Sequence, residues 1–411
     1  MQYVFNSVFH SSGKVRNNST LHSFTENKQI QLSLSPMRIA INTRFLLSSK
    51  MEGFGWFTYE VVKRIVTEHP EHDFFFFFDR AYDEKFIFAE NVTPIVLKPQ
   101  ARHPILFKIW FNNSVTKALK KRDIDLFFSP DGYLSLKTGV PQVGVIHDLN
   151  FEHYPEDLPK SALKYLKKYF PLFAKEAKHI VTVSHYSKKD ICETYKIAED
   201  KITVAHNGAS ELFIPLSLAQ KESVKSELSN NEDYFVFVGA LHARKNVQRL
   251  FEAFDIHKSK SKSKTKLVIV GEKLWNDKNL EKAFSKMVFQ ADVIFTGHLP
   301  IKKLTQVVGG AKALVFPSYF EGFGIPLVEA MKAETAVICG DRTSLPEVVE
   351  NAGLLVDPFS SRSIADGLAI IDQEESFRLG LIEKGKERAK KFSWDFTAEK
   401  IWNVLEQQLK N

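Results

Sequence analysis

The sequence of 411 residues is poor in cysteine and has no long hydrophobic run. Its two cysteines, Cys192 and Cys339, lie far apart and lack the spacing of metal ligands. This excludes a disulfide framework and favours a cytoplasmic location. No apolar run approaches the roughly 20 residues that a membrane-spanning helix requires.

A strong excess of one charge is also absent. Lys and Arg together number 56 and Asp and Glu 49, which gives a formal net charge of +7 at pH 7. This mild excess fits an anionic substrate or an anionic membrane surface, and we expect no nucleic-acid partner. The length favours two domains, each large enough for a core of its own.

Residues 1–36 lack the hydrophobic periodicity of the rest of the chain. They are rich in Ser, Asn, Thr and Gln, and their apolar residues are too scattered for the core of a signal peptide. A sharp strand pattern begins at Met37, which would be a natural first residue. We therefore predict that residues 1–36 are disordered or result from a misassigned start site.

From Met37 onward, strand and helix patterns alternate, which is typical of parallel sheets with crossover helices. We predict one domain over residues 37–213 and a second over residues 214–394. The polar stretch at 214–232 is interpreted as the linker region, because the strand pattern restarts at Tyr234. The low-complexity run at 258–266, which alternates Lys with Ser and Thr, is interpreted as a mobile loop.

A glycine-containing turn around residue 322 is the strongest motif. The apolar run 313–316 predicts a buried strand before it, and Pro326 suits the first position of a helix after it. Gly322 and Gly324 let the backbone between them approach a ligand closely. The free N–H groups and positive dipole end of the helix would then form a ready site for a phosphate.

Two carboxylates flank this turn, Glu321 before the glycines and Glu329 in the predicted first helical turn. A carboxylate does not bind phosphate, so beside a phosphate site it is suited to accept hydrogen bonds from sugar hydroxyls. For Glu329 a purely structural alternative is open, in which the side chain complements the helix dipole. That alternative does not explain Glu321.

A basic pair, Arg244 and Lys245, follows the strand pattern that ends at Gly239. A departing nucleoside diphosphate gains negative charge as its bond to the sugar breaks, and cationic side chains can stabilise that charge. Arg offers a two-pronged donor and Lys a point charge. The alternative is a solvated basic pair in a loop. Asn246, the next residue, can cap the following helix.

Further polar residues follow the predicted strands of the first domain. His147 and Asp148 end the strand 143–146, where parallel sheets carry functional groups. A structural histidine with satisfied hydrogen bonds is the alternative, and Asp148 could only orient the loop. Ser184 ends the strand 180–183, and its alternative, like that of the nearby Ser187, is helix capping.

Gly53 and Gly55 lie in a predicted loop between the first strand and the first helix. Such a loop is where open α/β sheets place one edge of a ligand. Their spacing does not match the dinucleotide-binding fingerprint, so we predict no nicotinamide cofactor. An ordinary pair of turn glycines is equally compatible with this segment alone.

Taken together, Glu321-Gly322-Phe323-Gly324-Ile325-Pro326 with Glu329 resembles the signature of the retaining glycosyltransferases of family 4 (glycosyl transferases group 1). Gly239 with Arg244, Lys245 and Asn246, and Ser344-Leu345-Pro346-Glu347, are similar to further runs of the family. The resemblance covers the chain from Met37 to the C-terminus. It implies a GT-B fold, α/β, with two Rossmann-like doubly wound domains facing across a cleft. It also implies that the last helix, 395–411, packs on the N-terminal domain.

The resemblance implies a role for each residue. The donor is a nucleotide-diphosphate sugar, held by the C-terminal domain, and the acceptor lies on the N-terminal domain. The expected catalytic groups are His147, Arg244, Lys245 and Glu321. The expected donor-binding residues are Gly53, Gly55, Gly239, Arg244, Lys245, Glu321, Gly322, Phe323, Gly324, Ile325 and Glu329. The expected acceptor-side residues are His147, Asp148 and Ser184. Glu347 is interpreted as a residue of loop and helix-start geometry and not as a catalytic group.

The implied reaction moves a hexosyl group to a glycan or lipid-linked acceptor with retention of configuration, without a metal ion or other cofactor. Family members include mannosyltransferases, which favours GDP-mannose as the donor and polysaccharide biosynthesis as the process; UDP-hexoses remain open. Two other kinds of function also remain open. One is a non-catalytic protein that binds sugar nucleotides, and the other is a phosphorylase-like or epimerase-like enzyme of the same fold.

Two charged segments allow more than one interpretation. Residues 159–178 predict a basic amphipathic helix, broken before Pro171, which either packs on the sheet with a solvated face or contacts anionic lipid at the inner face of the membrane. Asp123 and Asp125 have the spacing of a metal-binding pair. They begin a buried strand and do not end one, so we predict that they are solvated loop residues and that no metal is bound.

Overall fold

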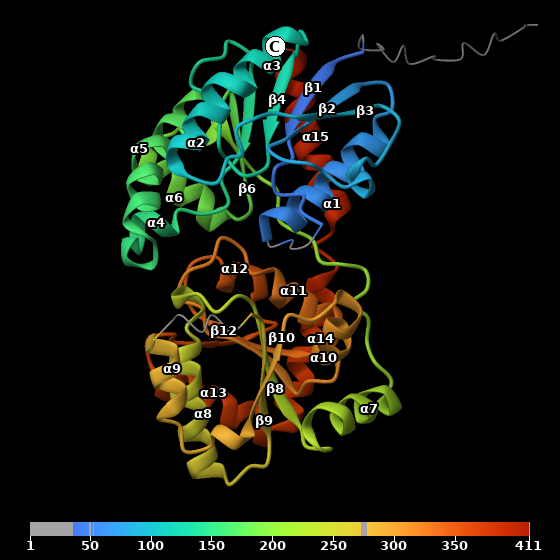
Figure 1. Cartoon of the computed structure of the whole chain (residues 1–411). Helices are drawn as coiled ribbons and strands as arrows, with labels where there is room; N and C mark the ends of the chain where they lie inside the picture. Colours follow the sequence, from blue (N-terminus) through green and yellow to red (C-terminus); the bar gives the residue numbers. More distant parts are fainter. Residues whose placement is uncertain (1–35, 49–50, 52, 273–277, 411) are drawn as a thin grey trace, which may run out of the picture. The chain divides into compact units, whose positions relative to one another are not determined.

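The computed structural model describes residues 36–48, 51, 53–272 and 278–410. The prediction for residues 1–36 therefore concerns a segment that, apart from Pro36, lies outside the described residues. The remaining chain from Pro36 is one compact unit that contains two parallel β-sheets with helices on their faces (Figure 1). The predicted α/β class with alternating strands and helices is confirmed.

The first sheet has seven strands in the order β3-β2-β1-β4-β5-β6-β7, and every pair is parallel. Its strands are β1 (Arg38–Asn42), β2 (Asp73–Phe78), β3 (Val92–Val96), β4 (Leu126–Ser129), β5 (Gln142–Val145), β6 (His179–Thr182) and β7 (Ile202–Val204). Its helices are α1 (Gly53–Glu68), α2 (Pro104–Ile109), α3 (Thr116–Lys121), α4 (Asn150–His153), α5 (Lys160–Glu176) and α6 (His185–Tyr195), with a π-helical turn at Trp110–Val115. We call this part the N-terminal lobe.

The second sheet has six strands in the order β10-β9-β8-β11-β12-β13, again all parallel. Its strands are β8 (Tyr234–Val238), β9 (Lys266–Val270), β10 (Val293–Gly297), β11 (Ala313–Phe316), β12 (Ala336–Gly340) and β13 (Leu354–Val356). Its helices are α7 (Leu218–Ser229), α8 (Val247–Ser261), α9 (Lys278–Ser285), α10 (Ile301–Gly309), α11 (Ile325–Lys332), α12 (Leu345–Val349), α13 (Ser361–Gln373) and α14 (Glu375–Ala389). We call this part the C-terminal lobe.

Both sheets owe their burial to continuous apolar strands. The five phenylalanines of β2 and all five residues of β8 are buried, as parallel strands covered by helices on both faces require. In each sheet the order reverses beside the first strand of the lobe, β1 or β8. Ligands of such sheets bind beyond the carboxyl ends of the strands at this reversal. The candidate residues after β8 and β11 lie at that position.

The last helix, α15 (Trp394–Lys410), packs against α1 of the N-terminal lobe. The indole of Trp402 stacks on the ring of His69 with centroids 3.7 Å apart, and the ring of Trp394 meets that of Phe57 edge to face. The chain thus returns to the first sheet after completing the second.

Three local predictions were wrong. The stretch 214–232 is not only a linker, because α7 forms there with a capping box between Ser217 and Gln220. Helix α5 continues through Pro171 without a break, and the buried Phe170 and Phe173 on either side hold it in place. Asn246 makes no side-chain cap; its amide donates to the carbonyl oxygens of Pro317 and Pro358 at 2.9 and 2.6 Å.

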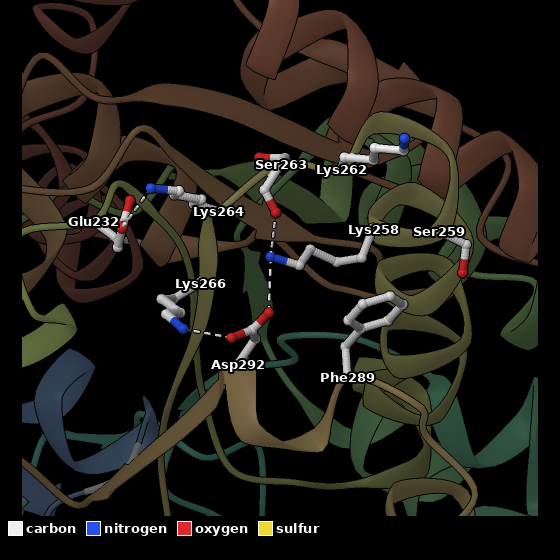
Figure 2. Close-up of a pocket in the computed structure, with 9 residues that line it drawn as sticks. All are labelled: Glu232, Lys258, Ser259, Lys262, Ser263, Lys264, Lys266, Phe289 and Asp292. Carbon is white, nitrogen blue, oxygen red and sulfur yellow. Dashed lines mark hydrogen bonds and ion pairs between the residues drawn. The ribbon is translucent and has the colours of Figure 1, made fainter.

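The run 258–266 is not a mobile loop either. Helix α8 extends to Ser261, and Lys258 is buried with its ammonium 2.8 Å from Asp292. Lys266 pairs with the same carboxylate, and these residues line a shallow basic pocket (Figure 2). The pocket lies near the start of β9, at the amino ends of the parallel strands, whereas the glycine turn follows the carboxyl end of β11.

Candidate active site

The predicted glycine turn connects β11 to α11. Gly324 adopts a left-handed conformation with φ of 98°, which favours glycine and lets the chain enter the helix. The hydroxyl of Ser344 donates to the carbonyl oxygens of Glu321 at 2.8 Å and of Phe323 at 3.2 Å. The amide of Glu321 donates to Thr343 Oγ1 at 3.1 Å. Hydrogen bonds with Thr343 and Ser344, in the segment that follows β12, therefore hold the turn in place.

The basic pair lies directly at this turn. Arg244 and Lys245 belong to one turn of 3-10 helix after β8, and the amide of Tyr319 donates to the carbonyl oxygen of Arg244 at 3.0 Å. Arg244 Nη1 is 2.7 Å from Glu321 Oε2 and also donates to the carbonyl oxygen of Phe320 at 3.1 Å. Lys245 Nζ is 2.6 Å from Glu321 Oε1. We call Arg244, Lys245 and Glu321 the charged triad.

Burial makes the charges of the triad depend on one another. Burial lowers the pKa of Lys245 to about 8, and the attraction of Glu321 keeps it from falling further. Burial also opposes the charge of Arg244, but the neighbouring carboxylates outweigh it and raise the pKa of the guanidinium. For Glu321, the two cations outweigh burial and lower the pKa of the carboxyl group. Near neutral pH the triad holds two positive charges and one negative charge.

Glu329 was predicted in the first turn of α11, but it lies in the second turn. Burial raises the pKa of its carboxyl group to about 7. Among the described residues, no hydrogen bond or ion pair engages this carboxyl group. The dipole alternative for Glu329 is weakened, because the dipole effect is confined to the first turn. A carboxylate without a cationic partner retains its capacity to accept hydrogen bonds from a ligand.

His147 and Asp148 follow β5, in the N-terminal lobe. The imidazole Nε2–H of His147 donates to the carbonyl oxygen of Pro130 at 2.8 Å, and the rings of Phe54 and Phe57 meet it edge to face. Burial lowers the pKa of His147, so the ring is neutral at physiological pH. The carboxylate of Asp148 accepts the amide of Asn150 at 3.0 Å and thereby shapes the loop.

The glycine turn meets this loop of the N-terminal lobe at Gly322. A Cβ atom at residue 322 would lie 2.4 Å from the carbonyl oxygen of His147 and 3.1 Å from Asp148 Cβ. The hydroxyl of Ser187 donates to the same carbonyl oxygen at 3.0 Å. The absence of a side chain at residue 322 therefore lets the His147 loop approach the charged triad.

The remaining predicted residues differ in their surroundings. The hydroxyl of Ser184 is buried and caps α6, accepting the amide of Ser187 at 3.0 Å, so its structural alternative is realised. Gly53 and Gly55 were predicted to lie in a loop, but both belong to the first turn of α1. A Cβ atom at Gly55 would lie 2.8 Å from the carbonyl oxygen of Phe45. The two glycines thus form the start of the first helix of the N-terminal lobe, and Gly55 allows that start to approach the backbone of Phe45 closely.

Gly239 follows β8 directly, in the segment that leads to the basic pair, and has a φ of 150°. A Cβ atom at Gly271, after β9, would lie 2.1 Å from the carbonyl oxygen of Gly239, so Gly271 is required for the close approach of the two chain segments. The sequence showed a glycine after this strand but gave no reason to connect it with Gly239. Asp125, from the predicted solvated pair, accepts the amide of Arg38 at 2.8 Å and fastens the start of β1.

Sequence reasoning missed a contact between the lobes beside the triad. The phenol of Tyr319 donates to both carboxylate oxygens of Asp157 at 2.9 Å, and its ring meets Tyr154 with centroids 4.7 Å apart. Burial raises the pKa of Asp157. Neither Asp157 nor Tyr154 belongs to a recognisable motif, so only their positions in space connect them with the site.

Comparison with protein families matches two models to consecutive parts of the chain. Residues 51–210 match the model described as Glycosyltransferase Family 4, and residues 219–388 match Glycosyl transferases group 1. Together the two models span most of the chain. In the region described by the structure, no helix is long and apolar enough to cross a membrane.

Two curated relatives are mannosyltransferases by name. O-antigen chain mannosyltransferase B of Escherichia coli is 27% identical over 357 residues, which cover 84% of this chain and 93% of the relative. O-antigen chain mannosyltransferase RfbU of Salmonella typhimurium is 30% identical over 233 residues, which cover 56% of this chain and 61% of the relative.

Solved structures share the fold at low identity. A glycosyltransferase from Rickettsia africae superposes with a TM-score of 0.71 and 18% identity, covering 92% of this chain and all of that one. Anabaena Alr3699/HepE in complex with UDP and glucose gives a TM-score of 0.72 and 16% identity, covering 90% of this chain and all of that one. These similarities confirm the predicted GT-B fold.

Proposed function

Since the chain belongs to glycosyltransferase family 4, whose members transfer a sugar from a nucleotide sugar, we propose that it is a retaining mannosyltransferase that uses GDP-mannose. The acceptor in this proposal is a glycan or a lipid-linked glycan. The observation that carries the proposal is the charged triad at the glycine turn, where Arg244 and Lys245 are both within 2.7 Å of Glu321.

The triad is suited to a diphosphate. Its two cations and single carboxylate leave an excess of positive charge in a largely buried position. Arg244 supplies a planar donor group and Lys245 a compact one, and both would stabilise the charge that develops on the departing diphosphate. The amides of residues 322 to 325 at the start of α11 add donors without any charge of their own.

Glu321 would exchange partners when the donor binds. Its Oε2 pairs with Arg244 and its Oε1 with Lys245. A bound diphosphate offers stronger and more numerous acceptor oxygens to Arg244 and Lys245, which releases the carboxylate to accept hydroxyl groups of the sugar. Glu329 would accept the ribose hydroxyls, as its raised pKa and lack of a cationic partner among the described residues allow.

His147 would lie on the acceptor side of the reacting carbon. Its neutral ring and the contact of its carbonyl oxygen with Gly322 support this assignment. In the proposed reaction the bond between sugar and diphosphate breaks on the face that the acceptor hydroxyl approaches, and the departing phosphate oxygen takes the acceptor proton. The new bond forms on that same face, so configuration is retained. Gly53 and Gly55 would border the diphosphate from the start of α1.

The names of the relatives support mannose over other hexoses, since the O-antigen enzymes of Escherichia coli and Salmonella typhimurium are both mannosyltransferases. The complex of Alr3699/HepE with UDP-glucose keeps UDP-hexoses as the alternative donors. A thermal-shift comparison of GDP-mannose, UDP-glucose and ADP-glucose decides between them, because a ligand that binds only the native state raises its stability. A shift with UDP-glucose and none with GDP-mannose would refute the choice of donor.

Incubation of the protein with the preferred donor alone tests the other kinds of function. A glycosyltransferase leaves the sugar configuration of the donor unchanged, whereas an epimerase converts it. Addition of oligomannose acceptors should then release GDP from the wild type, while Lys245→Ala should release it at least about a hundredfold more slowly. Donor binding without any release of GDP across acceptors would favour a non-catalytic binding protein.

We also propose that α5 lies against an anionic membrane surface while the enzyme acts on a lipid-linked acceptor. Five lysines along it are exposed, and so is Lys178 just beyond its end; the five are Lys160, Lys164, Lys167, Lys168 and Lys175. Leu172 on the same helix is 42% exposed, and α2, which packs against α5, adds Ile105 at 64%. Exposed apolar residues among lysines favour an interfacial helix over an ordinary solvated face.

Co-sedimentation at low salt tests this contact. Binding to vesicles that contain phosphatidylglycerol, no binding to pure phosphatidylcholine, and loss of binding in a Lys164→Glu, Lys168→Glu variant would support it. Equal recovery of wild type and variant in the supernatant would refute it.

A further inference from the structure

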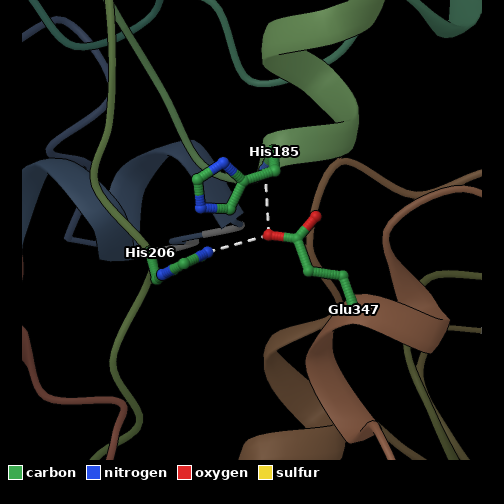
Figure 3. Close-up of side chains that lie close together, drawn as sticks. All are labelled: His185, His206 and Glu347. Carbon is green, nitrogen blue, oxygen red and sulfur yellow. Dashed lines mark hydrogen bonds and ion pairs between the residues drawn. The ribbon is translucent and has the colours of Figure 1, made fainter.

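Among the described residues, two histidines and one glutamate meet where the lobes contact each other: His185, His206 and Glu347 (Figure 3). His185 begins α6 and His206 follows β7, both in the N-terminal lobe, whereas Glu347 lies on α12 of the C-terminal lobe. One ligand atom from each residue lies within 4.8 Å of the other two. The proposed transfer reaction uses none of these side chains.

The carboxylate of Glu347 is held firmly in place. Its Oε1 accepts the amide of His185 at 2.8 Å, and its Oε2 accepts the amide of Tyr186 at 3.0 Å. His206 Nε2 lies 2.8 Å from the same Oε1. These hydrogen bonds lower the pKa of Glu347 against the effect of burial, so the carboxylate is ionised at neutral pH.

His206 is oriented as well. Its ring lies 6.0 Å from that of Phe323 and 5.8 Å from that of Phe392, both distances between centroids. The ring of His185 lies 5.5 Å from that of His206, and His185 is exposed at the surface. Two ligands are therefore fixed by their surroundings, and the third is free to turn toward them from the solvent side.

We propose that these three residues bind a transition-metal ion of the zinc class and thereby join the two lobes. Two imidazoles and one carboxylate are a ligand set of open zinc sites, in which water takes the fourth position. Bonds of about 2.0–2.2 Å from the metal to nitrogen and oxygen place tetrahedral ligand atoms roughly 3.4 Å apart. The three ligand atoms lie within 4.8 Å of one another in the structure, and rotation of the exposed His185 ring would bring its nitrogen closer to the other two.

The existing hydrogen bonds would support the metal and not compete with it. The ion would replace only the hydrogen bond between His206 and Glu347. The Nε2 proton of His206 would leave to solvent, and a ring that was neutral would take up a proton on Nδ1, so that Nε2 is free to ligate the metal. The amides of His185 and Tyr186 would keep the carboxylate oriented, which is the part that hydrogen bonds to ligating carboxylates play in metal sites. Binding requires neutral imidazoles, because a protonated ring nitrogen cannot ligate a metal ion.

Titration of the chelator-treated full chain with Zn²⁺, in competition with a chromophoric chelator, tests the proposal. The wild type should bind one ion at this site, and His185→Ala, His206→Ala and Glu347→Gln should each weaken binding at least about tenfold. His298→Ala, at an exposed position after β10, is the matched control and should bind as the wild type does.

A second measurement does not depend on the stability of the variants. Co²⁺ bound in the wild type should give the visible absorption of a tetrahedral ion, and His185→Ala, which changes only an exposed side chain, should lose that absorption. Absence of zinc binding to the wild type, or equal affinity in His185→Ala and His298→Ala, would overturn the proposal.

Discussion

Glu321→Gln tests the charged triad most directly, because it removes the negative charge and keeps the shape of the side chain. In the wild type, Glu321 lies 2.7 Å from Arg244 Nη1 and 2.6 Å from Lys245 Nζ. The substitution leaves the buried Lys245 and the half-buried Arg244 with no carboxylate between them. The proposed function then predicts opposite effects on two quantities: tighter binding of the nucleoside diphosphate product and slower transfer of the sugar.

The size of the binding effect follows from the geometry. Two like unit charges about 6 Å apart repel by roughly 3 kcal/mol at an effective dielectric constant of about 20. Solvent and rearrangement reduce this repulsion between Glu321 and the phosphates, and we expect GDP to bind about tenfold more tightly, or ~1.4 kcal/mol. Transfer should slow at least about a hundredfold, because the contact with the sugar hydroxyls is lost.

The gain in binding should depend on pH. Burial and Arg244 lower the pKa of Lys245, and Glu321 opposes them, which leaves the pKa at about 8. Without Glu321 the pKa falls below this value, so Lys245 loses its proton at a lower pH than in the wild type. The tenfold gain is therefore expected at pH 6 and should shrink by pH 8.5.

Isothermal titration with GDP at both pH values, and release of GDP in the presence of acceptor, measure the two effects. Glu383→Gln, an exposed substitution on α14, serves as the control for the change in net charge. Weaker binding of GDP at pH 6, or transfer at the rate of the wild type, would refute the role given to the triad.

Three further predictions concern neighbouring residues. Turnover should fall as the pH rises through about 8, where Lys245 loses its proton, and Lys245→Arg should move this decline to higher pH in a pH–rate profile. Gly322→Ala should abolish most activity, since its Cβ would lie 2.4 Å from the carbonyl oxygen of His147, whereas the control Gly380→Ala, with no atom within 4 Å, should leave activity and fold intact. Glu329→Gln should raise the melting temperature at pH 8, by the equivalent of ~1 to 2 kcal/mol of unfolding free energy, and much less at pH 5. The reason is that burial raises the pKa of the Glu329 carboxyl group to about 7, so its ionisation at higher pH destabilises the native state of the wild type. Equal melting temperatures of variant and wild type at pH 8 would contradict the last of these.

Much of the fold could be predicted because its signals are local. The apolar runs of β2, β8 and β11 and the turns between strands and helices are visible in a few consecutive residues. Errors arose where distant contacts overrode local preference. Asn246 has the residue type of a helix cap, yet its amide bonds to the carbonyl oxygens of Pro317 and Pro358. Pro171 has the residue type of a helix breaker, yet buried neighbours keep α5 continuous.

The candidate site could be predicted in its residue types but not in its charges. The motif around Glu321 and the pair at residues 244 and 245 are each recognisable in the sequence. That both cations face the two oxygens of one carboxylate depends on the pairing of β8 with β11, which no local pattern discloses. The raised pKa of Glu329 depends in the same way on burial by distant parts of the chain.

The two glycines of the turn look equivalent in the sequence, but the structure requires them for different reasons. Gly324 is required by its backbone, since a φ of 98° costs other residues about 1–2 kcal/mol. Gly322 is required by its neighbour, because a side chain there would displace the loop of His147 from the triad. Alanine at residue 324 should therefore lower mainly stability, and alanine at residue 322 mainly turnover. A glycine-rich turn in this position thus serves the joining of the lobes as much as the binding of phosphate.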